Sequence, residues 1–118
     1  MDLSHLHLKV TDVSASRKFY ETIFGFREDF VCDQDEVFLK NDEDFVIGLQ
    51  KLDEAGTLPG WFHFGFGCKS EGEVVATLEK LKSSNGKLLR ELQDRGGAIY
   101  FFCADPDGNK IEVYFNKP

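Results

Sequence analysis

The chain opens on a stretch in which polar and apolar residues alternate, as they do in a half-buried β-strand. Within Leu3–Thr11, one face carries Leu6, Leu8 and Val10, and the opposite face carries His5, His7 and Lys9. The period of two therefore predicts a first strand with two histidines on its polar face.

A helix and three strands are predicted next. Asp12 or Ser14 is placed to cap the helix, and Gly25 favours a left-handed stop after it. The predicted apolar stripe of this helix contains Phe19, Ile23 and Phe24. Apolar runs at about 26–33, 37–41 and 45–52, separated by acidic turn-prone residues, predict the three strands. The first half therefore has the order βαβββ.

The second half repeats this plan after a connector. Residues 53–60 contain two Gly and one Pro, which is typical of a linker. The elements expected after it are a strand over 61–69, a helix from about 70 to 86, and strands at about 88–93, 98–104 and 109–116. Ser70-Glu71-Gly72-Glu73 has the form of a capping box, and Asp105-Pro106-Asp107-Gly108 predicts a tight turn. The sequence predicts one α+β domain over 1–118, in which modules 1–52 and 61–118 form a cupped mixed sheet with helices outside.

Length and composition suit one globular domain. The 118 residues are 42% hydrophobic and 30% charged, so neither disorder nor a fibrous class fits. With 14 Lys and Arg against 21 Asp and Glu, the net charge of −7 opposes binding to the phosphate backbone of nucleic acids. We expect a cytoplasmic protein without membrane contact, because no secretory leader and no apolar run of membrane-spanning length is found.

The three cysteines are expected to be reduced thiols. Cys32, Cys68 and Cys103 are an odd number at wide spacings, and no CxxC pair suggests a zinc knuckle or a redox dithiol. Each lies in an apolar, strand-like context. This context favours buried, inert thiols over metal ligands or reactive groups.

The alternation in the second half brings further polar residues to the face that carries the histidines. The aromatic face of the strand over 61–69 consists of Phe62, Phe64 and Phe66. His63 lies on the opposite face, and it opens the second half as His5 opens the first. Glu112 alternates with apolar neighbours in the last strand and shares the histidines' side of the sheet. Gly48 is its counterpart in the first half.

Two imidazoles and one carboxylate on one side of a sheet predict a metal site. His5, His63 and Glu112 would suit a divalent ion such as Zn, Ni, Mn or Fe, and three ligands leave positions open for water or substrate. Each residue also has an ordinary explanation, since histidine and glutamate are common on exposed strand faces. The coincidence of all three, at equivalent points of a repeat, favours the metal site.

Three segments together resemble the vicinal oxygen chelate superfamily of glyoxalase I, fosfomycin-resistance, bleomycin-resistance and extradiol dioxygenase proteins. The first is His5-Leu6-His7-Leu8-Lys9-Val10-Thr11-Asp12-Val13 with Phe19-Tyr20 and Phe24-Gly25-Phe26, and the second is Phe62-His63-Phe64-Gly65-Phe66. The third, Asp105-Pro106-Asp107-Gly108-Asn109-Lys110-Ile111-Glu112, resembles the closing D-P-D-G-x-x-x-E motif and is the most specific. The resemblance covers essentially the whole chain and implies a glyoxalase-like fold with His5, His63 and Glu112 as metal ligands.

The resemblance also bears on the activity. Glyoxalase I uses a fourth ligand, a glutamate at the position of Gly48, whereas the fosfomycin-resistance enzymes use three ligands. The stretch from Arg90 to Gly97 does not match the potassium and phosphonate loop of the latter, and extradiol dioxygenases mostly pair two such domains in a longer chain. The resemblance implies lyase, isomerase or thiol-transfer chemistry, with the metal as Lewis acid on a small substrate that chelates through vicinal oxygens.

Further residues on the polar faces are candidates for the site. We expect His7, two residues from His5, to support the site or to transfer protons, with cavity lining as the plainer alternative. The residues expected to line the substrate pocket are Gly48, Trp61, Lys110 and Tyr114. Neither the substrate, the metal nor the use of a thiol such as glutathione follows from the sequence.

Alternatives to an enzyme and to a monomer follow from the same resemblance. A bleomycin-resistance-like protein would sequester a cationic aromatic drug without metal, and the acidic charge and abundant Phe suit that role. A metal-free structural module is a third option.

Small enzymes of the resembled family commonly form dimers with shared sites. We therefore expect a homodimer in which His5 of one chain meets His63 and Glu112 of the other, rather than a triad within one chain.

Overall fold

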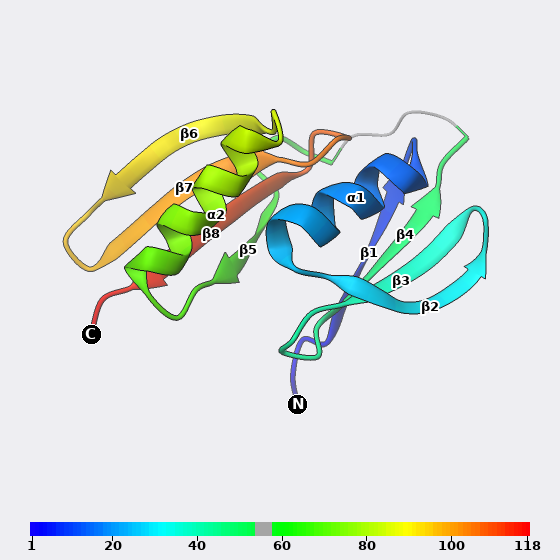
Figure 1. The fold of residues 1–118 in the computed structure, drawn as a ribbon, viewed down its shortest axis with the longest axis horizontal. Coiled ribbons are helices and arrows are strands. Elements are labelled where there is room, and N and C mark those ends of the chain that lie inside the picture. The colour runs from blue at the N-terminus through cyan, green and yellow to red at the C-terminus, as the bar shows by residue number, and fades with distance from the viewer. Residues whose placement is uncertain (54–57) are drawn as a thin grey trace. The chain divides into compact units, whose positions relative to one another are not determined.

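The structure, a computed structural model, describes residues 1–53 and 58–118. The chain divides into two compact units, Met1–Gly56 and Thr57–Pro118 (Figure 1). Each unit has the order βαβββ and a four-stranded mixed sheet, so the predicted α+β fold of two modules is confirmed. The connector expected over 53–60 lies partly outside the described residues. That the two units form one domain stays a prediction.

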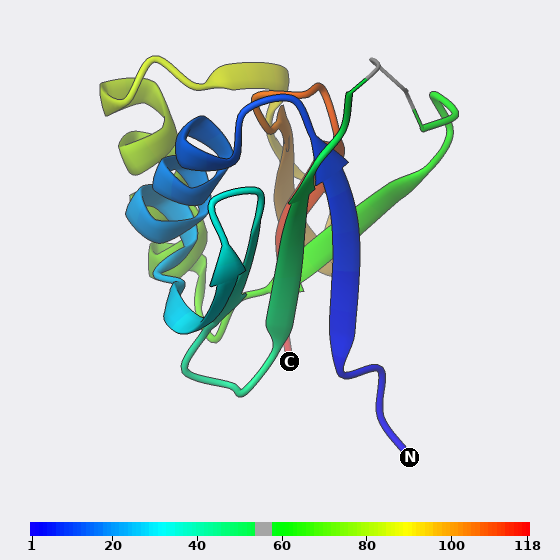
Figure 2. The ribbon, with the colours of Figure 1, turned by 90° about the vertical axis from the view of Figure 1, so that its right-hand side faces the viewer.

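The first unit is a four-stranded sheet with one helix. Its elements are β1 (His5–Val10), α1 (Val13–Phe24), β2 (Arg27–Asp33), β3 (Glu36–Lys40) and β4 (Val46–Lys51). The strands lie in the order β1-β4-β3-β2, with β1 parallel to β4 and the other pairs antiparallel. Figure 2 shows α1 against one face of this sheet, where it packs on β3 and β4. The opposite face is left for polar side chains.

The helix α1 begins and ends where the sequence predicts, but its buried stripe is different. The carboxylate of Asp12 accepts a hydrogen bond from the backbone N–H of Ala15 at 3.0 Å, and Gly25 ends the helix with φ of +71°. The buried residues of α1 are Ser16, Tyr20 and Ile23. Phe19 and Phe24 remain half-buried, so the stripe predicted through them is wrong. The spacing of four and then three residues puts Tyr20 on the sheet instead.

The second unit repeats this arrangement. Its elements are β5 (His63–Gly67), α2 (Glu71–Ser83), β6 (Lys87–Asp94), β7 (Ala98–Ala104) and β8 (Lys110–Asn116). The strands lie in the order β5-β8-β7-β6, with β5 parallel to β8. The helix packs on β6, β7 and β8 through Val74, Thr77, Leu78 and Leu81. Neither α1 nor α2, the two helices in the described ranges, is long and apolar enough to cross a membrane.

Local hydrogen bonds define the start of α2 and the turn before β8. The Ser70 hydroxyl accepts from the backbone N–H of Glu73 at 3.1 Å, and the Glu73 carboxylate accepts from the backbone N–H of Lys69 at 3.1 Å. In the turn before β8, the buried carboxylate of Asp105 accepts from the N–H groups of Asp107 and Asn109 at 3.0 and 2.9 Å. This predicted turn therefore sets the residue at which β8 begins, and with it the position of Glu112 on the strand.

The cysteines differ in burial. All three are free thiols, with Cys103 buried, Cys68 half-buried and Cys32 exposed on β2. The expectation of burial is wrong for Cys32, because every residue of the edge strand β2 is exposed. Burial raises the pKa of the Cys103 thiol to about 12 and that of Cys68 to about 11. These two thiols are therefore protonated at neutral pH.

Candidate functional site

The strand register relates the candidate residues of the two units. His5 opens β1 opposite Val46, and His63 opens β5 opposite Lys110. Two residues further along, the facing pairs are His7 with Gly48 in the first unit and Gly65 with Glu112 in the second. Gly48 and Glu112 therefore occupy corresponding positions, and so do His7 and Gly65.

The burial pattern follows the predicted alternation in β1 and β8. In β1, Leu8 and Val10 are buried, whereas all three polar residues on the other face are exposed. In β8, Ile111 and Val113 are buried, whereas Lys110, Glu112 and Tyr114 stay partly exposed. The helix side of each sheet is apolar, and the candidate residues lie on the opposite side.

In the second unit, His63 and Glu112 come from adjacent parallel strands and share a neighbour. Phe102 on β7 faces Glu112 in the register, and its ring meets the His63 ring edge-on with centroids 5.3 Å apart. The Lys110 ammonium lies 4.8 Å from the centroid of the same phenyl ring. Within residues 1–53 and 58–118, no hydrogen bond or ion pair engages the Glu112 carboxylate. Its oxygens are thus available to a cation or a substrate.

Two glycines on β5 make room for Tyr114. A Cβ built on Gly67 would lie 3.2 Å from the Tyr114 hydroxyl oxygen, and one built on Gly65 would lie 3.4 Å from a ring carbon of Tyr114. The phenol ring therefore lies across β5, over both glycines, on the side of His63. The spacing Gly65-Phe66-Gly67 is the sequence signal for this contact, and it is apparent only once β5 and β8 are known to be neighbours.

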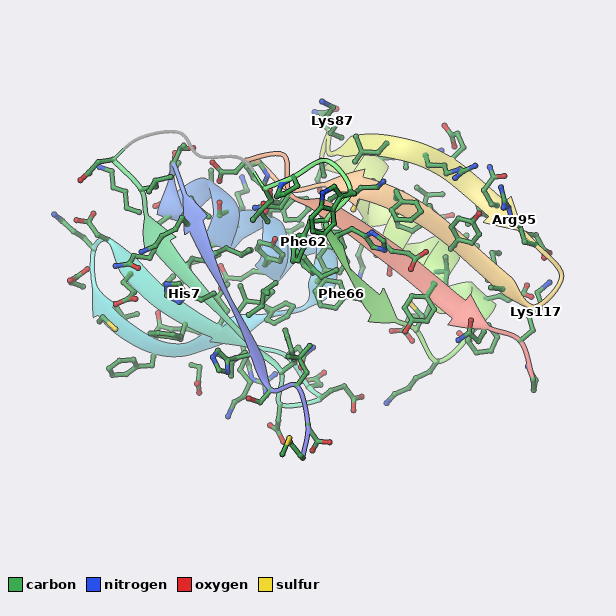
Figure 3. All side chains as sticks on the ribbon, turned by 180° about the vertical axis from the view of Figure 1, so that it is seen from behind. His7, Phe62, Phe66, Lys87, Arg95 and Lys117 are labelled. Atoms are coloured by element: carbon green, nitrogen blue, oxygen red, sulfur yellow. The ribbon has the colours of Figure 1, made fainter. Side chains whose placement is uncertain are left out.

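In the first unit, His7, which Figure 3 labels, belongs to a polar cluster. Its Nε2 lies 3.0 Å from Oε1 of Gln50 and 3.8 Å from a carboxylate oxygen of Glu36. The ammonium of Lys9 donates a hydrogen bond to the same oxygen of Gln50. Sequence reasoning missed Gln50 and Glu36, although the alternation of β3 and β4 puts both on the side of His7.

The absence of a side chain at Gly48 has a steric cause. A Cβ built there would lie 2.6 Å from Nδ1 of His7 and 2.8 Å from Cε1 of Phe38. These two rings already occupy the space above Gly48, so a larger residue would displace one of them. At this position along the paired strands, the larger residue is His7 on β1 in the first unit and Glu112 on β8 in the second unit.

The predicted metal ligands are divided between the two units. His5 belongs to the first unit, whereas His63 and Glu112 belong to the second. In the described parts of the chain, no three His, Cys, Asp or Glu side chains gather in a metal-binding group. Two imidazoles and one carboxylate are a donor set that suits a divalent cation. The Ser4 hydroxyl lies 3.2 Å from Nδ1 of His5, so Nε2 of this ring remains available as a ligand. Trp61, expected as a pocket wall, precedes β5 and is 79% exposed.

A family comparison agrees with the fold. Residues 2–113 match the Glyoxalase/Bleomycin resistance protein/Dioxygenase superfamily. The chain belongs to this superfamily. Its membership confirms the resemblance inferred from the opening strands and the D-P-D-G turn.

Two relatives and one solved structure are similar to the chain. It is 32% identical to a trivalent organoarsenical cleaving enzyme of Bacillus sp. strain MD1, over 99% of this chain and 74% of the relative. It is 31% identical to a lactoylglutathione lyase of Haemophilus influenzae, over 99% of this chain and 94% of the relative. The crystal structure of the fosfomycin resistance protein FosX from Listeria monocytogenes has a TM-score of 0.84 at 23% identity, covering 99% and 94% of the two chains. The last likeness concerns the fold alone.

Proposed function

We propose that this protein is a divalent-metal-dependent enzyme that acts on a small substrate with two adjacent oxygen atoms. The observation that carries the proposal is the correspondence of His5 with His63 and of Gly48 with Glu112 in the strand registers. It gives the protein two imidazoles and one carboxylate on the polar faces of its sheets. Superfamily membership and the relatives named as a lyase and as a cleaving enzyme support an enzyme rather than a structural module.

His5, His63 and Glu112 would hold the metal, which is Zn, Ni, Mn or Fe by the chemistry of these donors. When bound, it would supply Lewis-acid chemistry, polarising a carbonyl or stabilising an oxyanion. Phe102 packs edge-on against the imidazole of His63. The missing fourth carboxylate at Gly48 leaves more of the site open to substrate oxygens than in a four-ligand enzyme.

The remaining side chains would bind the substrate and handle protons. His7 is the proposed proton-transfer group, since an imidazole can both donate and accept a hydrogen bond and its ring is hydrogen-bonded to Gln50. Lys110 and Tyr114 flank Glu112 on the same face of β8 and would contact the substrate. A thiol co-substrate such as glutathione fits the relative named lactoylglutathione lyase. The active form would be a cytoplasmic homodimer.

Metal analysis of the purified protein tests this proposal. We expect about one divalent ion per chain after reconstitution with Zn, Ni, Mn or Fe and desalting. The metal-loaded protein should then turn over a hydroxyacyl-thiol or diketone panel, and chelator treatment should abolish the turnover. A protein that retains no metal but binds cationic aromatic compounds would instead be a drug-sequestering member, like the bleomycin-resistance proteins.

A further inference from the structure

The hydrogen bonds around His7 determine which of its nitrogens carries the proton. The Lys9 ammonium has only donors, so the Gln50 atom that faces it must be the carbonyl oxygen and not the amide nitrogen. The same oxygen lies 3.0 Å from Nε2 of His7. Because a carbonyl oxygen only accepts, Nε2 must be the donor.

The carboxylate of Glu36 acts in the same direction. One of its oxygens lies 3.8 Å from Nε2, so a second acceptor faces the nitrogen that carries the proton. In the neutral imidazole only one nitrogen is protonated. Nδ1 is therefore the nitrogen with the free lone pair.

The Nδ1 atom of His7 lies close to Gly48 on the neighbouring strand β4. It lies 2.6 Å from the position that a Cβ of Gly48 would take, and the His7 side chain is 37% exposed. Since Gly48 corresponds to Glu112, each unit offers one acceptor at this level of its sheet. The second unit offers a carboxylate oxygen, and the first offers an imidazole nitrogen from the neighbouring strand.

We propose that Gln50, oriented by Lys9, is a positioning residue that holds neutral His7 as its Nε2–H tautomer, which leaves Nδ1 as the hydrogen-bond acceptor of the ring. Gln50 acts through His7 and does not itself touch the substrate. This assignment rests on the proposed function only in the role that it gives to His7 during turnover. The tautomer itself is a property of the first unit, and it is independent of metal.

Nitrogen NMR of the ¹⁵N-labelled, metal-free protein tests the tautomer directly. The spectra are recorded at increasing pH until the ring nitrogen shifts of His7 stop changing, so that only the neutral ring is observed. We expect the Nε2–H pattern for His7. In Gln50→Leu the ratio of the two tautomers should fall roughly fivefold, as expected for the loss of one hydrogen bond. Gln50→Glu keeps an acceptor and should keep the Nε2–H form.

Two lysines on neighbouring strands give a matched pair of variants. Lys9→Met frees the Gln50 amide to turn and should shift the tautomer ratio, whereas Lys51→Met, exposed at the end of β4, should not. An Nδ1–H pattern in the parent protein, or an equal ratio in Gln50→Leu and the parent, overturns the proposal. If the protein proves active, Gln50→Leu should lower kcat with KM and metal content unchanged. Failure of the metal proposal would leave the NMR result standing, so the two outcomes are distinguishable.

Discussion

The imidazole of His7 fills the space that a side chain at Gly48 would need, with its Nδ1 2.6 Å from the place of the missing Cβ. Gly48→Ala should therefore force His7 or Phe38 to move. We expect a loss of about 1–3 kcal/mol in the free energy of unfolding, the usual cost of overpacking, measured by urea denaturation. Gly97→Ala is the control, since no atom lies within 4 Å of its added Cβ. Equal stability of the two variants would contradict the steric account.

The proposed ligands make a prediction about metal content. His5→Ala, His63→Ala and Glu112→Ala should each lower the affinity for the divalent ion by more than about 100-fold, because even partners that only support a ligand contribute about 10–100-fold. Elemental analysis after dialysis measures the retained metal. His7→Ala should retain it, which makes this variant the matched control. Full occupancy in any two of the three ligand variants would rule out the triad.

The correspondence of Gly48 with Glu112 can be tested by transplanting the arrangement of one unit into the other. The double variant His7→Gly with Gly48→Glu reproduces the Gly65–Glu112 pair of the second unit. We expect it to bind metal at least about tenfold more tightly than Gly48→Glu alone, in which His7 still blocks the new side chain. Titration calorimetry compares the two. Equal affinities would mean that the space above Gly48 does not reach the metal.

Sharing of sites between chains predicts the outcome of mixing two inactive variants. In a heterodimer of His5→Ala with Glu112→Ala chains, shared sites would place both lesions in one site and leave the other intact. About half of the heterodimer's sites should then recover metal after subunit exchange. No recovery would locate each triad inside a single chain. A mixture of two His5→Ala preparations is the negative control.

The buried thiol of Cys103 predicts a loss of stability at alkaline pH. Its pKa is raised from 9.0 to about 12, so the unfolded chain releases this proton at lower pH than the folded protein does. The contribution is complete below pH 9.0 and is lost as pH rises towards about 12. Urea denaturation between these limits should show a flatter pH dependence for Cys103→Ala. Cys32→Ala should change the pH dependence less, because the Cys32 thiol is exposed and water screens the groups that raise its pKa.

Periodicity predicts the fold and the faces of the strands because each strand has one apolar side. Leu8 and Val10 are buried and His5 and His7 are exposed, as the alternation at the start of the chain requires. The predicted stripe of α1 differs from the buried one because Phe19 and Tyr20 are adjacent aromatic residues, and only packing decides which of them is buried. Local pattern cannot rank adjacent aromatic residues.

The polar cluster around His7 lies beyond what one sequence reveals. Gln50 and Glu36 are ordinary surface residues in the pattern, and they become partners of His7 only through the pairing of β1 with β4 and of β4 with β3. The same holds for Tyr114 over the two glycines of β5. Contacts between strands far apart in the chain depend on register, which the period of two does not specify.

The larger residue of each facing pair is His7 on β1 in the first half and Glu112 on β8 in the second half, so the two halves differ in the side chains that they present. A tandem of two first halves would present imidazoles from His5 and His7 and no carboxylate at the level of Gly48. A tandem of two second halves would present His63 and Glu112 twice, the two-histidine, two-glutamate donor set of a four-ligand site. The natural order joins one half of each kind. Under the proposed function, the strand that carries the larger residue at this one position would decide whether the repeated fold offers a divalent ion three donors or four.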